Sequence, residues 1–179
     1  KLVGEYGYVV ENFKFIARLA GELGLRLVVE NNCTRWDEIP DDEEFDPERH
    51  LGKVRQYFCT YPEEWLQLVD DVNEPAFGLC MDTSHATNFA HRFPLQERAS
   101  VYHRFIDLAG DRLWHVHWND NFVDKIEGRG DPHLSLGQGS VPRDVHERLW
   151  HQPSVTGYLL EHWYGEEALL DELKFIEKL

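Results

Sequence analysis

Residues 77–82 read FGLCMD, a short apolar run that ends on Asp82. Three further runs have the same form: LRLVVE at 25–30, LWHVH at 113–117 and GYLLE at 157–161. Amphipathic segments with helical periodicity separate them. Apolar strands separated by helices build parallel sheets, because a parallel connection requires a crossover. The sequence therefore predicts an α/β fold around four parallel strands.

Each of these four runs ends on a side chain that binds metals well: Glu30, Asp82, His117 and Glu161. Ligand sites in parallel sheets lie beyond the carboxyl ends of the strands. A set of carboxylate oxygens and one imidazole suits a divalent cation. An acid that caps a helix or faces water would explain any one of these residues, but it explains all four poorly. We predict that the four meet at one metal ion.

Length and composition narrow the class of protein. The 179 residues correspond to a single domain, 1–179, which is short for a closed eight-stranded barrel of ~250 residues. Because the chain starts at Lys1 and opens at once on a helical pattern, we expect it to be the later part of a longer protein. The formal charge of −15 disfavours nucleic-acid binding.

The cysteines and the hydropathy pattern indicate the compartment. Cys33, Cys59 and Cys80 form no CxxC pair, and the odd number fits a reducing cytoplasm better than a disulfide framework. No apolar stretch approaches 18 residues, so we expect no membrane span. The polar segment 31–61 is too long for an ordinary connection. It predicts a lid, an insertion or a partner surface such as an oligomer contact, with a short helix near 50–58.

Further candidates flank the strand ends. Asp82 heads DTSH, so His85 lies in the following turn, where it could ligate a second metal or donate to a substrate. A polar helix N-terminus would explain the same four residues. Asn32 is a further candidate for substrate binding. Asn119 and Asp120 follow His117 closely, and we expect them to orient its ring.

The loop 128–139, GRGDPHLSLGQG, carries three more candidates. Asp131 and His133 are two positions apart and could face one ion, whereas Arg129 could pair with a phosphate or carboxylate. A polar surface loop with turn glycines is the plainer explanation. His115 shares the face of His117 one layer deeper, as a core histidine. The remaining histidines are expected at the surface: His50, His91, His103, His146, His151 and His162.

Five motifs in this order resemble the xylose isomerase-like TIM-barrel superfamily: LVVEN, GLCMDTSHA, HVHWND, DPHLSLGQG and LLEHW. That superfamily includes sugar-phosphate isomerases and epimerases and the endonuclease IV-type AP endonucleases. The resemblance implies a (β/α)8 barrel of which this chain forms the last four βα units. It also implies that Glu30, Asp82, His117 and Glu161 hold a divalent metal and that the two glutamates move protons. His85 matches a histidine that binds substrate or a further metal, and Asp131 and His133 match the D-x-H of the nuclease cluster.

The expected activity is divalent-metal-dependent isomerisation or epimerisation of a small sugar or sugar derivative through an enediolate. The cofactor is one Mn, Mg, Co or Zn ion, or more if the site is nuclease-like. Two alternatives stay open: a zinc-dependent AP endonuclease or phosphodiesterase, and a non-catalytic binding module. We expect a sugar substrate, neither nucleic acid nor membrane as partner, and a homo-oligomer as one option. The chain alone is expected to be inactive.

Overall fold

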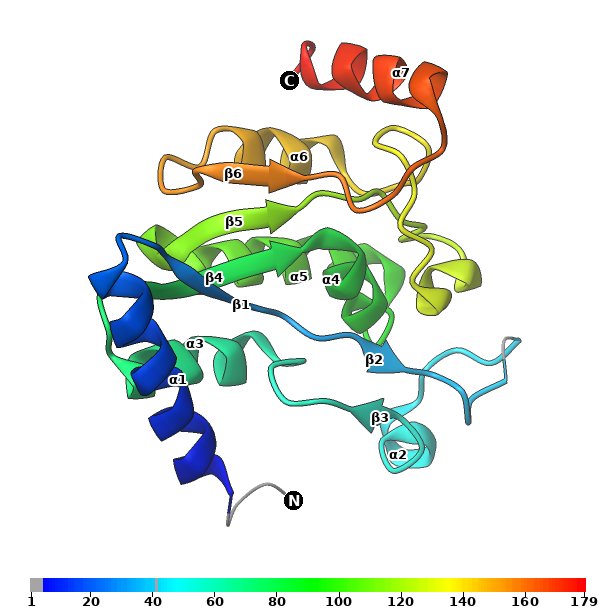
Figure 1. Ribbon diagram of the computed structural model, residues 1–179. Coiled ribbons are helices and arrows are strands. Elements are labelled where there is room, and N and C mark those ends of the chain that lie inside the picture. Colours follow the sequence, from blue (N-terminus) through cyan, green and yellow to red (C-terminus); the bar gives the residue numbers. More distant parts are fainter. Residues whose placement is uncertain (1–4, 41) are drawn as a thin grey trace.

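Four parallel strands form the main sheet in a computed structural model that describes residues 5–40 and 42–179 (Figure 1). They are β1 (Leu27–Glu30), β4 (Phe77–Asp82), β5 (Leu113–His117) and β6 (Gly157–Leu159), in the order β1-β4-β5-β6. The register pairs Glu30 with Cys80 and Asp82 with His117. The carboxyl ends of the strands therefore meet at one edge, as the sequence predicts. Strand β6 ends two residues before Glu161.

The helices follow the predicted pattern with one addition, α4. Their bounds are α1 (Tyr6–Glu22), α3 (Pro62–Val72), α4 (Thr83–Ala90), α5 (Leu95–Ala109), α6 (Arg143–Trp150) and α7 (Glu166–Ile176), with 3-10 turns η1 (Gly110–Arg112) and η2 (Ile126–Gly130). Helix α4 begins directly after β4 because the Asp82 side chain accepts a hydrogen bond from the His85 N–H and caps it. No helix in the described residues is long and apolar enough to cross a membrane.

The core lies between the sheet and helices α3, α5 and α6. Trp65 of α3 and Phe105 of α5 are fully buried, with ring centroids 5.8 Å apart. Trp118 is also fully buried, and its Nε1 donates to Nδ1 of His146 on α6. Trp118 thus points away from His117, as strand alternation predicts. These helices cover one face of the sheet. The opposite face is left free for polar side chains.

The segment 31–61 is not one structureless loop. Strands β2 (Thr34–Arg35) and β3 (Arg55–Gln56) pair antiparallel beyond the carboxyl end of β1 (Figure 1). Trp36, Ile39 and Val54 form a small core of their own. The helix expected near 50–58 is wrong: helix α2 covers Pro47–His50, because Asp46 accepts the Glu48 N–H and caps it there.

Candidate metal centre

The four side chains that end or follow the strands come together at the carboxyl edge of the sheet. Glu30, Asp82, His117 and Glu161 each offer a ligand atom, and these atoms all lie within 4.8 Å of one another. Nδ1 of His117 is at the centre: it lies 2.9 Å from Glu30 Oε1, 3.3 Å from Glu161 Oε2 and 4.0 Å from Asp82 Oδ2. Three carboxylates thus surround one imidazole nitrogen. We call these four residues, Glu30, Asp82, His117 and Glu161, the carboxylate group.

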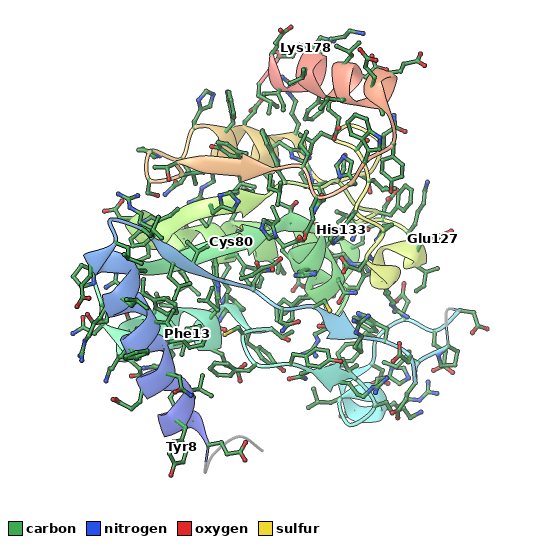
Figure 2. All side chains as sticks on the ribbon, in the orientation of Figure 1. Tyr8, Phe13, Cys80, Glu127, His133 and Lys178 are labelled. Carbon is green, nitrogen blue, oxygen red and sulfur yellow. The ribbon has the colours of Figure 1, made fainter. Side chains whose placement is uncertain are left out.

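A second set of side chains adjoins the first through Asp82. Asp82, His85, Asp131 and His133 also place ligand atoms within 4.8 Å of one another. His85 Nε2 lies 3.3 Å from Asp131 Oδ2, and His133 Nε2 lies 3.8 Å from Asp82 Oδ2. Figure 2 shows His133 near the carboxyl ends of the strands. Because Asp82 belongs to both sets, the two form one continuous polar centre.

Two buried asparagines hold Asp82 in place. Asn31 pairs with the Asp82 backbone twice, accepting its N–H at 2.7 Å and donating Nδ2 to its carbonyl oxygen at 3.1 Å. Asn119 donates Nδ2 to Asp82 Oδ2 at 3.1 Å, and its Oδ1 accepts the Glu161 N–H at 3.2 Å. The expectation that Asn119 orients His117 is therefore wrong, because its side chain bonds Asp82 and Glu161. Neither asparagine is exposed to solvent.

The loop that carries Asp131 and His133 has an unusual backbone. Both residues adopt positive φ angles, 61° and 43°, which cost free energy in residues other than glycine. Asp120 fixes the far end of the loop: its carboxylate accepts the N–H groups of Gly137 and Val141 at 2.9 and 3.1 Å. Asp120 therefore organises this loop rather than His117, contrary to the expectation from sequence.

Burial and mutual charge shift the pKa values of the centre. Hydrogen bonds with Cys80 and Glu30 raise the pKa of His117 to about 11. The Asp131 carboxylate raises the pKa of His133 to about 9. Burial raises the pKa of Asp82 to about 6, although the neighbouring histidines oppose this. With no cation bound, protonated imidazoles offset the carboxylates, so a bound cation would displace protons.

Burial alone would lower the pKa of His85, but Asp131 and Asp82 outweigh it and raise the pKa to about 10. Burial alone would raise the pKa of Glu30, but the hydrogen bond from His117 and the nearby charges of His117, His85 and His133 together bring the pKa below its ordinary value. The Glu30 carboxylate is thus held in the charged form that a metal ligand requires.

The residues present fit a divalent cation. Among the described residues, the ion-pair partners of Glu30, Asp82 and Glu161 are the imidazoles of His85, His117 and His133, and none is a Lys or Arg. Asp131 Oδ1 and His133 Nε2 face each other at 3.3 Å, yet neither forms a well-shaped hydrogen bond within the described part of the chain. Buried polar atoms without good partners are rare in folded proteins and point to an absent ligand.

Two sequence candidates, Arg129 and Asn32, have other contacts in the structure. The Arg129 guanidinium is buried and sits 4.4 Å from the ring centroid of Trp36, outside both sets. The Asn32 side chain accepts the N–H of its neighbour Cys33. The structure therefore places the Arg129 guanidinium against Trp36 and the Asn32 amide against the backbone that follows it.

Several histidines predicted at the surface are buried. His50, His91 and His146 are nearly inaccessible, and the His162 side chain is only 5 % exposed. Nε2 of His162 donates to Glu172 Oε1 at 2.8 Å, and Nδ1 lies 3.0 Å from Asn119 Oδ1. His91 Nε2 donates to the Phe122 carbonyl at 2.9 Å. Each polar ring is tolerated inside because it has a partner.

Sequence reasoning missed the residues that support the centre from behind, Asn31, His162 and Glu172. Asn31 directly follows Glu30, and a polar residue after a strand end is a signal that could have identified it. Glu172 lies in the last helix, where its pattern is that of an ordinary surface acid. No sequence feature marks it as a buried partner of His162.

Comparison with known proteins defines the family. The model of the xylose isomerase-like TIM barrel family matches residues 4–179, so the chain belongs to this family. The resemblance drawn from the five motifs is confirmed, and so is the fold class.

Solved structures share the fold at low identity. A D-tagatose 3-epimerase-like protein matches 94 % of this chain with a TM-score of 0.64 and 19 % identity. The 3-keto-D-glucoside 4-epimerase YcjR from E. coli matches all of it with a TM-score of 0.58 and 12 % identity. D-psicose 3-epimerase from Clostridium cellulolyticum H10 matches 99 % with a TM-score of 0.56 and 15 % identity. The chain spans only 52 to 56 % of the length of these proteins.

Proposed function

We propose that this chain supplies the metal centre of a divalent-metal-dependent isomerase or epimerase that acts on a small sugar or sugar derivative. The observation that carries the proposal is the carboxylate group, in which Glu30 at the end of β1 and Glu161 just beyond β6 approach the same nitrogen of His117. The epimerase relatives support it through their shared fold. The three cysteines are buried and unpaired, which fits a cytoplasmic enzyme.

Glu30, Asp82, His117 and Glu161 would hold the cation. A bound Mn, Mg, Co or Zn ion would polarise the carbonyl and adjacent hydroxyl oxygens of the sugar as a Lewis acid. Glu30 and Glu161 act on the proton of the carbon next to the carbonyl: one carboxylate removes it and the other returns it, with an enediolate between the two steps. Return to the same carbon on the other face gives an epimer, and return to the neighbouring carbon gives an isomer.

The other residues of the centre bind and orient. Asp82 is fully buried and fixed by Asn31 and Asn119, so it serves as a rigid ligand rather than a base. Nδ1 of His85 lies 2.8 Å from the Asn31 carbonyl oxygen and donates to it, which turns Nε2 towards the centre. From there His85 can contact a sugar oxygen.

Deuterium exchange tests the proposal. We expect the whole protein, incubated with Mn²⁺ and a panel of ketoses in D₂O, to incorporate deuterium at the carbon next to the carbonyl. Glu161→Gln should slow the exchange by ~10²–10⁴-fold, because it removes one proton-transfer group. The protein should still bind Mn²⁺ through the other three ligands. Glu167→Gln on the exposed side of α7 is the matched control and should exchange normally. Absence of exchange with every ketose would contradict the proposal.

A second candidate function rests on the Asp82, His85, Asp131 and His133 set. Two adjoining ligand sets could hold two or more zinc ions, which suits phosphodiester hydrolysis. Cleavage of a duplex with an abasic site, together with no ketose exchange, would favour this AP endonuclease activity. The net charge of −15 argues against it, because a DNA backbone would be repelled.

A further inference from the structure

A third group of metal-ligating side chains lies one layer below the carboxylate group. Cys80, His115 and His117 place a sulfur and two ring nitrogens within 4.8 Å of one another. The register explains the meeting: Cys80 on β4 pairs with His115 on β5, and His117 is two positions further along the same strand. Figure 2 shows Cys80 within the sheet, away from the carboxyl ends.

The sheet makes room for this group at Gly157. Gly157 on β6 pairs with His115, and a Cβ atom there would lie 2.7 Å from His115 Nδ1. Because Gly157 has no Cβ, the His115 ring can keep this position without a steric clash. The ring centroids of His115 and His117 are 5.5 Å apart. Cys80 is 1 % exposed, so its sulfur belongs to the interior of the site.

We propose that Cys80, His115 and His117 form a separate binding site for a thiophilic cation such as Zn²⁺ or Cd²⁺. One sulfur and two imidazoles are the ligands that such ions prefer, whereas Mg²⁺ and Mn²⁺ prefer the oxygens of the carboxylate group. In a tetrahedral site with one sulfur and two nitrogens, ligand atoms lie ~3.3–3.5 Å apart, given bonds of ~2.0 Å to nitrogen and ~2.3 Å to sulfur. The three ligand atoms lie within 4.8 Å of one another, so modest side-chain rotations would bring them to these distances. As the sulfur–metal bond forms, the thiol proton leaves to solvent.

The two sites share His117. A cation held by Cys80 and His115 draws on the same imidazole that the carboxylate group uses, so its binding weakens the hold on Mn²⁺. This consequence for turnover rests on the proposed function, whereas the thiolate site itself does not. The protein would therefore bind Mg²⁺ or Mn²⁺ at one site and thiophilic cations at the other. The thiophilic cations would inhibit turnover.

Cadmium titration of the purified, metal-free protein tests the site. We expect a thiolate-to-metal charge-transfer band in the near ultraviolet that saturates at one Cd²⁺ per chain. Cys80→Ser should abolish the band, whereas Cys59→Ser, at a second buried cysteine, should leave it unchanged. His115→Gln should weaken Cd²⁺ affinity at least ~10-fold, because one ligand is lost. His151→Gln, at an exposed histidine, is its control.

A circular dichroism spectrum and a melting curve like those of the unmodified protein show that a variant has folded. If Cys80→Ser fails this check, Cys80→Ala and His115→Gln carry the test. A band that is absent from the unmodified protein, or that survives loss of Cys80, overturns the site. A band without any ketose exchange leaves the site standing and removes the proposed sugar chemistry instead.

Discussion

At the scale of single residues, Asn119 decides how the carboxylate group is built. Its amide bonds Asp82 on one side and the Glu161 backbone on the other, so one buried side chain sets the spacing between a ligand at the end of β4 and a ligand just beyond β6. Its Oδ1 also faces His162 Nδ1 at 3.0 Å. Partners behind metal ligands usually tune affinity strongly, because they fix the orientation of the ligating atoms.

Asn119→Ala should therefore weaken the binding of Mn²⁺ by ~10–100-fold. The loss has two causes: Asp82 Oδ2 loses its donor, and Glu161 is released from its fixed distance. Isothermal titration calorimetry with Mn²⁺ measures the effect. Asn12→Ala, at an exposed position of α1, is the matched control and should bind normally. Equal affinity in the two variants would show that Asn119 serves only packing.

The sequence was sufficient for the residues that face the centre and insufficient for those behind it. Strand endings and side-chain alternation alone place Glu30, Asp82 and His117 on one edge. The pairing of Asn31 with Asp82 joins residues 51 positions apart, and local pattern carries no trace of it. Burial of His162 depends on its partner Glu172 in α7, and the sequence pattern gives no sign of this contact.

At the scale of elements, α7 is attached to the body of the protein through Glu172. Glu172 is 2 % exposed and is the one fully buried residue of this helix. Its Oε1 accepts the Leu136 N–H at 2.8 Å and meets His162 Nε2 at 2.8 Å. Helix α7 thereby ties the loop 131–139 to the residue that follows Glu161.

Glu172→Ala should loosen α7 and this loop together. It leaves the Leu136 N–H and Nε2 of His162 without their partner, at a cost of about 1–3 kcal/mol. Hydrogen–deuterium exchange should show lost protection over 134–139 and 166–176, while α3 keeps its protection. Glu167→Ala, an exposed acid on the same helix, is the control. Loss confined to α7 would show that the loop is held independently.

Elements with long periodic patterns were predictable, and short ones were not. Helices α3 and α5 fall on Pro62–Val72 and Leu95–Ala109, where an opening proline and an apolar stripe mark them. Helix α4 is eight residues long and contains mostly polar or small residues. Its existence depends on the Asp82 cap. The antiparallel strands β2 and β3 have two residues each, too few to show an alternation of apolar and polar side chains.

At the scale of the whole molecule, the sheet as described has β1 and β6 at its edges. Edge strands present unpaired backbone groups and invite association. Large apolar side chains are also exposed, including Phe15 at 70 % and Leu23 at 66 %, both on or next to α1. The epimerases of the same fold are nearly twice as long as this chain. All four residues of the carboxylate group nevertheless lie within these 179 residues.

Metal binding needs only the four ligands, whereas turnover also needs a complete substrate pocket. We expect the 179-residue chain alone to bind Mn²⁺ but to exchange no deuterium into ketoses. A sugar substrate needs a pocket that surrounds it, and half of a barrel provides only part of one. It should also self-associate through its edges and exposed apolar surface, which light scattering after size-exclusion chromatography measures. The whole protein should bind Mn²⁺ with similar affinity, remain monodisperse and catalyse exchange. A monodisperse 179-residue monomer with full turnover would show instead that four strands suffice for the complete active site.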